Sequence, residues 1–289
     1  MIQWGCKIFS EHTFPDLFFC SGKRGVGEIV TLYIKEEAMM KKGLLESCVD
    51  SVESALEAAK GGADRLELCA GLVIGGITPT PAVYEEIRKY SDIPINVLIR
   101  PRFGDFCYTD HEIEVIASDI RTFKSLGANG AVIGALCPDG SLDERAMEKF
   151  MSAADGMSVT LHRAFDMCRD PFTVLGQSKR LGINTILTSG QEDSCSAGKE
   201  LIRRLVEQAG DEIDILVGGG VNAEVIRELC PYTKATSFHM SGKVNLESTM
   251  RYRKQNVHMG IPGLSEYEIY RTSADKIRSA KNVLTELAG

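Results

Sequence analysis

The segment GGADRLELC, which runs from Gly61 to Cys69, decides the fold of this chain. Its two glycines suit the left-handed residues that end a helix. In the run that follows, Leu66 and Leu68 alternate with Glu67, which is the period of a β-strand. A helix that ends directly before a short strand is the repeating unit of α/β proteins.

The same unit recurs from residue 44 to the C-terminal end. Eight strands are expected, at Leu44–Cys48, Arg65–Cys69, Ile95–Arg100, Ala131–Gly134, Ser158–His162, Thr185–Ser189, Ile213–Gly218 and Thr236–Met240. Eight helices are expected to follow them, at Asp50–Lys60, Thr80–Lys89, Asp110–Leu126, Leu142–Ala154, Pro171–Leu181, Ser194–Gln208, Ala223–Leu229 and Tyr267–Leu287. Eight such units in about 250 residues predict a (β/α)8 TIM barrel of parallel strands with outer helices. A doubly wound open sheet is disfavoured, because no Gly-x-Gly-x-x-Gly motif follows the first strand.

Residues 1–40 differ from the rest of the chain, since their aromatic residues show no period and no secretory signal pattern. Lys35–Glu37 can be encoded by a purine-rich stretch that resembles a bacterial ribosome-binding site. One hypothesis therefore takes Met39 or Met40 as the true start, and the alternative is a real, poorly ordered extension. Residues 41–289 are expected to form a single TIM-barrel domain.

Composition excludes several classes of protein. The 289 residues include 33 basic and 40 acidic side chains, for a net charge of −7, and no Lys/Arg block that would suit nucleic acid. No apolar run is long enough to span a bilayer, so no membrane partner is expected. The 9 cysteines are scattered and odd in number, which indicates a reducing cytoplasm rather than a disulfide framework.

Strand alternation predicts an unusually polar barrel lumen. Charged or polar side chains fall on the inward set of several strands, namely Glu46, Glu67, Arg100, His162 and His239. A barrel interior normally holds branched apolar residues, and buried charges must pair or meet a ligand. The alternative is a self-contained salt-bridge network of Glu46, Glu67 and Arg100.

The loops after the strands add further candidates. Asp105 and Asp166 follow the third and fifth strands, where they support either the site or a local turn. Gly219 and Gly220 follow the seventh strand and Ser241 follows the eighth. Exposed backbone N–H groups at such turns suit an anion such as phosphate, although glycine also serves tight turns.

Cys48 and Cys69 end neighbouring strands, which lie about 4.8 Å apart in a sheet. Two thiols at equivalent depth suit a soft ion such as Cu(I), whereas zinc normally requires four ligands. The alternative is a pair of buried thiols that act as small hydrophobic residues.

These residues lie in motifs that resemble the CutC family of copper homeostasis proteins. The motifs are Gly62–Cys69, Gly75–Pro79, Ile99–Arg102, Gly104–Tyr108, His162–Met167, Leu187–Gln191 and Met250–Arg253. The resemblance implies a (β/α)8 barrel, a cytoplasmic location, copper handling and homo-oligomers. It also implies that Cys48 and Cys69 are Cu(I) ligands.

Two functions are therefore weighed. The first is a cytoplasmic copper homeostasis protein whose thiol ligands are surrounded by Glu46, Asp105, Asp166 and His239. The second is an enzyme that acts on a small phosphorylated or carboxylated metabolite, with Glu67 and His162 as the proton-transfer pair. Its anion would contact Arg100, Arg102, Gly219, Gly220 and Ser241. A scaffold function is favoured by no feature of the sequence.

The connection from Lys243 to Glu266 is long for the loop between a strand and a helix. It contains Arg251–Arg253, and we weigh three interpretations: a lid over the barrel mouth, a surface loop, or an oligomer contact.

Overall fold

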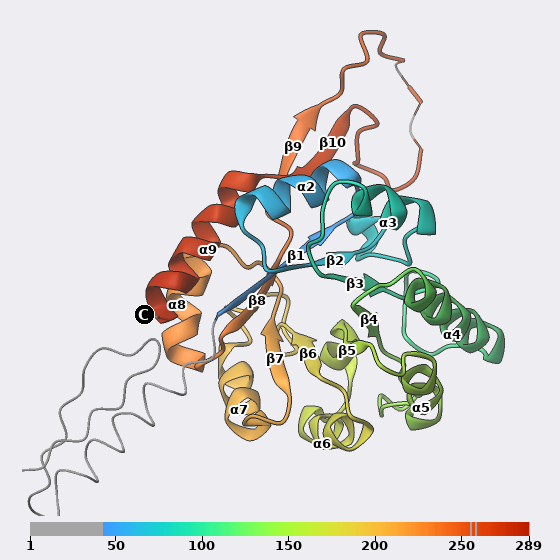
Figure 1. Cartoon of the computed structure of the whole chain (residues 1–289), viewed down its shortest axis with the longest axis vertical. Coiled ribbons are helices and arrows are strands. Elements are labelled where there is room, and N and C mark those ends of the chain that lie inside the picture. Colours follow the sequence, from blue (N-terminus) through green and yellow to red (C-terminus); the bar gives the residue numbers. More distant parts are fainter. Residues whose placement is uncertain (1–42, 255, 258, 289) are drawn as a thin grey trace, which may run out of the picture. The chain divides into compact units, whose positions relative to one another are not determined.

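The computed structural model describes residues 43–254, 256–257 and 259–288, and the predictions for residues 1–40 lie outside this range. Eight parallel strands form a closed barrel in the order β1 to β8, which confirms the predicted TIM barrel (Figure 1). The strands are β1 (Leu44–Val49), β2 (Arg65–Leu68), β3 (Ile95–Leu98), β4 (Gly130–Ile133), β5 (Ser158–Leu161), β6 (Thr185–Thr188), β7 (Asp214–Val217) and β8 (Ser237–Met240).

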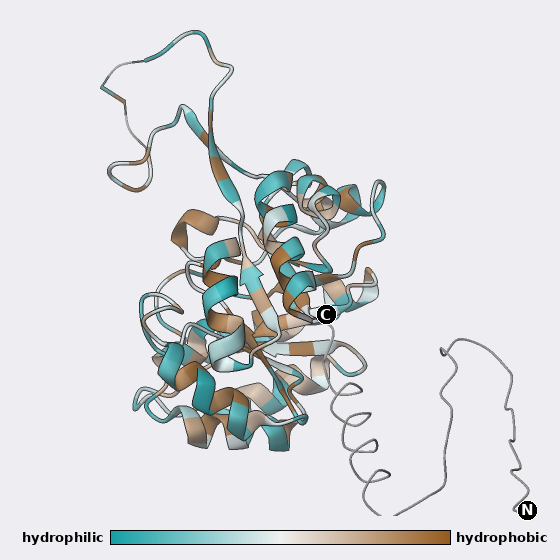
Figure 2. Ribbon diagram, turned by 90° about the vertical axis from the view of Figure 1, so that its left-hand side faces the viewer, coloured by the Kyte–Doolittle hydropathy of each residue, from teal (hydrophilic) through white to brown (hydrophobic). Residues whose placement is uncertain are grey.

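Helices form a ring around these strands (Figure 1). The α-helices are α2 (Val52–Gly61), α3 (Pro81–Arg88), α4 (Asp110–Ser125), α5 (Glu144–Ala153), α6 (Pro171–Leu181), α7 (Lys199–Ala209), α8 (Ala223–Thr233) and α9 (Ala274–Ala288). Two 3₁₀ helices, η1 (Leu72–Ile74) and η2 (Arg163–Met167), follow β2 and β5. Figure 2 shows hydrophobic and hydrophilic residues side by side along the α-helices, as expected where one stripe packs on the strands. No helix in the described ranges is both long and apolar enough to traverse a bilayer.

The predicted start of the last helix is wrong. Glu268–Thr272, which the prediction placed in a helix, forms β10 and pairs antiparallel with β9 (Lys243–Glu247). The apolar spacing of this stretch could not show that its partner lies some twenty residues earlier in the chain. The hairpin projects away from the barrel past α2 (Figures 1 and 2), so the lid interpretation of the Lys243–Glu266 connection is also wrong.

The last helix is held against the start of the barrel by close packing and by one ion pair. Lys281 on α9 contacts the Asp64 carboxylate at 2.6 Å, and Asp64 also accepts a hydrogen bond from the Leu45 amide. A Cβ added at Gly61 would lie 2.6 Å from the Cβ of Ile277. Glycine at this position therefore sets how closely α2 and α9 approach.

We expect Gly61→Ala to destabilise the protein by about 1–3 kcal/mol, because the added methyl group overpacks the contact between α2 and α9. Gly176→Ala in α6 is the matched control, since the nearest atom to its added Cβ is 3.9 Å away. That change should stabilise the fold by about 0.5–1 kcal/mol through helix propensity. Urea unfolding measures both variants, and a Gly61→Ala protein as stable as the parent contradicts the packing argument.

A candidate site in the barrel lumen

The alternation of side chains predicted which strand residues face the lumen. Leu66 and Leu68 pack in the buried layer between strands and helices. The intervening Glu67 is 6% exposed and belongs to the opposite, inward set, together with Cys69. On β8, Phe238 likewise packs in the outer layer. The predicted polar lumen is therefore present.

Glu46 lies at the centre of the first polar group, with no exposure to solvent. Its carboxylate forms an ion pair with Arg65 Nε and a 2.8 Å contact with His239 Nδ1. These partners come from the two strands that flank β1, since Glu46 is in register with both residues. Burial acts to raise the pKa of Glu46, but the His239 hydrogen bond and the Arg65 charge outweigh it and lower the pKa. Sequence reasoning missed Arg65, although it shares the inward set of Glu67.

Glu67 completes a compact donor set with Glu46 and His239, whose ligand atoms all lie within 4.8 Å of one another. Burial and the nearby Glu46 charge raise the pKa of Glu67 to about 7, against the opposing charges of His239 and Arg65. Burial acts to lower the pKa of His239, but the Cys48 and Glu67 charges and the hydrogen bonds to Cys48 and Glu46 raise it well above its ordinary value. The group can therefore hold a proton or a cation.

Cys48 on β1 and Cys69, directly after β2, are 7% and 1% exposed. Cys48 is in register with Glu67, so Cys69 lies two residues further toward the carboxyl ends of the strands and the expected equal depth of the two thiols is wrong. Cys69 Sγ donates to the Val49 carbonyl at 3.5 Å and packs with Leu98 and Val132. Burial, and then the charge of the nearby Cys48, raises the pKa of Cys69 well above its usual range. A cation that binds here must displace the thiol proton.

Arg100 and His162 form a second polar group, at the ends of β3 and β5. The Arg100 guanidinium lies over the Phe106 ring at 4.8 Å, and the His162 ring lies 4.9 Å from the same ring. Within the described ranges, Arg100 forms no ion pair with Glu46 or Glu67, so the expected salt-bridge network of these three residues is wrong. Glu67 and His162 form no hydrogen bond with each other, and their pairing in proton transfer stays a prediction. Glu67 Oε2 and His162 Nε2 are both buried, and neither has a hydrogen-bond partner among the described residues.

The remaining predicted residues hold loops together. Arg102, in the loop after β3, forms ion pairs with Asp105 at 3.0 Å and with Glu112. The Asp166 carboxylate accepts hydrogen bonds from Thr188, from both the amide and the hydroxyl of Ser189, and from other groups of the loop after β6. Among the described residues, neither aspartate forms a hydrogen bond with Cys48 or Cys69, so their expected place around these thiols stays a prediction.

The turn after β7 uses glycines in the positive-φ conformation that other residues rarely adopt. Gly219 and Gly220 have φ values of +93° and +84°. A Cβ at Gly219 would lie 2.9 Å from the Ser189 Cβ, so tight packing alone explains this glycine. Ser241 uses its carbonyl to accept from the Thr272 hydroxyl at 3.0 Å. A phosphate role for this turn stays a prediction.

Comparison with known proteins assigns the family. The model of the CutC family matches residues 43–244, which is more than half of the chain. The chain belongs to the CutC family. The human copper homeostasis protein cutC homolog is 44% identical over 246 residues, which cover 83% of this chain and 90% of the human protein. A CutC family protein of Histophilus somni is 40% identical over 84% of this chain and 99% of its own.

Solved structures agree with this assignment. A CutC structure from Streptococcus agalactiae superposes with a TM-score of 0.66 at 32% identity and covers 69% of this chain and 98% of its own. Thiamine phosphate pyrophosphorylase from Pyrococcus furiosus, at 16% identity and a TM-score of 0.51, shares the fold alone. This CutC chain is thus a TIM barrel of a copper homeostasis family.

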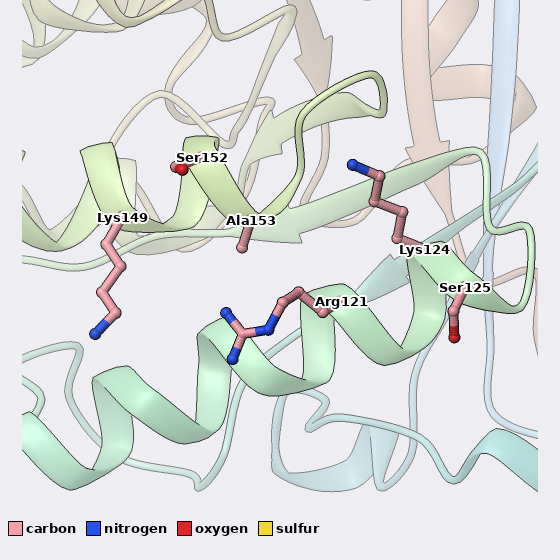
Figure 3. A pocket seen from close by; sticks show the side chains of 6 residues that line it. All are labelled: Arg121, Lys124, Ser125, Lys149, Ser152 and Ala153. Atoms are coloured by element: carbon pink, nitrogen blue, oxygen red, sulfur yellow. The ribbon is translucent and has the colours of Figure 1, made fainter.

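A separate hollow of about 700 Å³ lies on the outside of the CutC barrel, between α4 and α5 (Figure 3). It is lined by Arg121, Lys124, Ser125, Lys149, Ser152 and Ala153. Most of these residues lie at the carboxyl ends of the two helices, which face the amino ends of the strands in a barrel of this topology. The hollow is therefore not part of the lumen site.

We expect Glu67→Gln to stabilise CutC at pH 8. Because the folded pKa of about 7 lies above the ordinary 4.5, the folded state binds the proton more tightly, and the wild type loses stability as pH rises between these values. Glutamine stays neutral, so thermal unfolding at pH 8 should show a gain of roughly 2 kcal/mol, and a smaller gain at pH 5. Glu148→Gln on the exposed surface of α5 is the control. A variant less stable than wild type at pH 8 contradicts the assignment.

Proposed function

We propose that this CutC protein binds Cu(I) through Cys48 and Cys69 and serves copper homeostasis in the cytoplasm. One observation carries the proposal: two buried thiols lie at neighbouring parallel strands, staggered by two residues, and burial and the charge of Cys48 raise the pKa of Cys69. Relatives named as copper homeostasis proteins support the biological context.

The donor set and its surroundings suit a soft monovalent ion. Thiolates select Cu(I), and two of them are a sufficient ligand set for that ion. Leu98 and Val132 pack against Cys69, which gives one side of the sulfur an apolar environment. Calcium and magnesium require oxygen ligands and are disfavoured at this position.

His239 supports the same site from β8. Its Nδ1 atom contacts Glu46 at 2.8 Å, and the charge of Cys48 is the largest cause that raises its pKa. A carboxylate that fixes the orientation of an imidazole is a common partner of metal ligands. We therefore assign His239 to balancing the charge of the Cys48 thiolate, and Glu46 to orienting the His239 ring.

We expect the wild-type protein to bind one Cu(I) per chain when titrated without oxygen against a colorimetric Cu(I) chelator. The Cys48→Ser/Cys69→Ser double variant should bind at least about 100-fold more weakly, because serine offers Cu(I) no soft ligand. Cys230→Ser is the control, since this half-buried cysteine lies on α8, outside the lumen. Equal affinity of the double variant and the control would falsify the ligand assignment.

A second candidate function is an enzyme that acts on a small phosphorylated or carboxylated metabolite. It is favoured by buried polar atoms that lack hydrogen-bond partners among the described residues and lie on the inward set of the strands. These atoms belong to Arg65, Glu67, Asn96, Arg100, Thr160 and His162. Buried polar groups are normally satisfied, so their concentration here indicates that water or another polar molecule occupies the lumen.

If the protein is an enzyme, Glu67 is the proton-transfer group, because its Oε2 atom is buried and has no described partner. In a screen of carboxylated and phosphorylated metabolites, any turnover by the wild type should fall by about 100-fold or more in Glu67→Gln. Glu148→Gln should keep full activity. Turnover that survives in Glu67→Gln contradicts this role.

A further inference from the structure

Arg100 carries a buried positive charge that no acidic side chain of the described ranges balances. The residue is 8% exposed, and its guanidinium donates to the carbonyl oxygens of Gly75 at 3.4 Å, Gly76 at 3.2 Å and Gly104 at 2.7 Å. These bonds use three of its five N–H groups and supply no negative charge. An uncompensated buried charge is costly, so an anion is expected to complete its environment.

His162 presents a second buried donor near this charge. Its Nδ1 atom accepts a hydrogen bond from the Ala164 amide at 3.1 Å, so a neutral ring carries its hydrogen on Nε2. Burial and the Arg100 charge lower the pKa of His162 to about 3, which keeps the ring neutral near pH 7. The Nε2 atom is buried, and no described residue accepts its hydrogen.

Tyr108 presents a third donor. Its hydroxyl is buried and has no partner of hydrogen-bonding geometry among the described residues. Burial raises the pKa of Tyr108 to about 12 despite the opposing Arg100 charge, so the hydroxyl keeps its proton. Arg100 thus acts electrostatically on both His162 and Tyr108, and Arg100 and His162 both pack against the Phe106 ring.

We propose that Arg100, His162 and Tyr108 form a subsite that binds the carboxylate group of a small monoanionic molecule. The three groups offer donors, and Arg100 retains its Nε–H and a second N–H, which match the two oxygens of a carboxylate. The subsite carries a single positive charge, because His162 and Tyr108 are neutral. One negative charge on the ligand balances this positive charge, whereas a phosphate dianion would leave one negative charge buried without a partner.

This subsite does not include the two thiols. It names the ligand group for the second candidate function, the enzyme, and its catalytic role rests on that function. Binding is measured independently of turnover, as line broadening of ¹³C-labelled acetate in the NMR spectrum, with sodium chloride at equal ionic strength as reference. We expect the wild-type protein to broaden the ¹³C signal of acetate. Under the same conditions it should broaden the ³¹P signal of inorganic phosphate less.

Tyr108→Phe is the decisive variant. It should weaken acetate binding by about tenfold or more, because a hydrogen bond to a charged group is lost. Its thermal stability should change little, since the hydroxyl forms no hydrogen bond of regular geometry among the described residues and its one described interaction partner, Arg100, keeps its bonds to backbone carbonyl oxygens. His162→Leu should weaken acetate binding in the same way. Tyr90→Phe is the control, because Tyr90 is exposed and bonds only to Glu86 on the outer surface.

The Cys48→Ser/Cys69→Ser variant should bind acetate as the wild type does, so loss of copper binding and loss of acetate binding are separate results. Acetate binding that is equal in wild type and Tyr108→Phe overturns the subsite, as does wild-type protein that binds no acetate. Phosphate that binds more tightly than acetate overturns the ligand class.

Discussion

A carboxylate with no exposure to solvent holds the first strand of the barrel to both of its neighbours. Glu46 on β1 contacts Arg65 on β2 and His239 on β8, so one ion-paired group spans the seam where the barrel closes. A buried ion pair adds little net stability, but loss of one partner costs about 3–5 kcal/mol, because a charge is left unpaired. A slip of one residue would also move Glu46 into the outer apolar layer. The pair therefore fixes register as well as closure.

The lumen built on this seam has two chemically different sides. Around β8, β1 and β2 lie the carboxylates, His239 and the two thiols. At the ends of β3 and β5 lie Arg100 and His162, which offer only donors. Leu98 and Val132, on β3 and β4, pack with Cys69 and contribute an apolar layer to the lumen. The two proposed sites, one for a soft cation and one for an anion, would thus lie on different sides of one lumen without neutralising each other.

Strand alternation was sufficient to predict the barrel and the inward set, because both depend on local periodicity. It could not predict the partners within the lumen. Arg100 is held by the carbonyl oxygens of Gly75, Gly76 and Gly104, which carry no side-chain signature. Arg65 was within reach of the same reasoning, since it lies two residues before Glu67. Sequence alternation could not predict the β10 strand, because its hydrogen bonds depend on β9, a distant segment of the chain.

The charges around Cys48 would reduce the cost of burying a copper site in the interior of the barrel. Two thiolates around one Cu(I) leave one net negative charge, which is costly to bury without a counter-charge. His239 supplies that charge, because Cys48 and the two glutamates raise its pKa well above the ordinary value. Arg65 at the same time balances Glu46 from the far side. In the proposed Cu(I) site, the buried carboxylates would therefore act indirectly, by keeping a proton on the His239 imidazole.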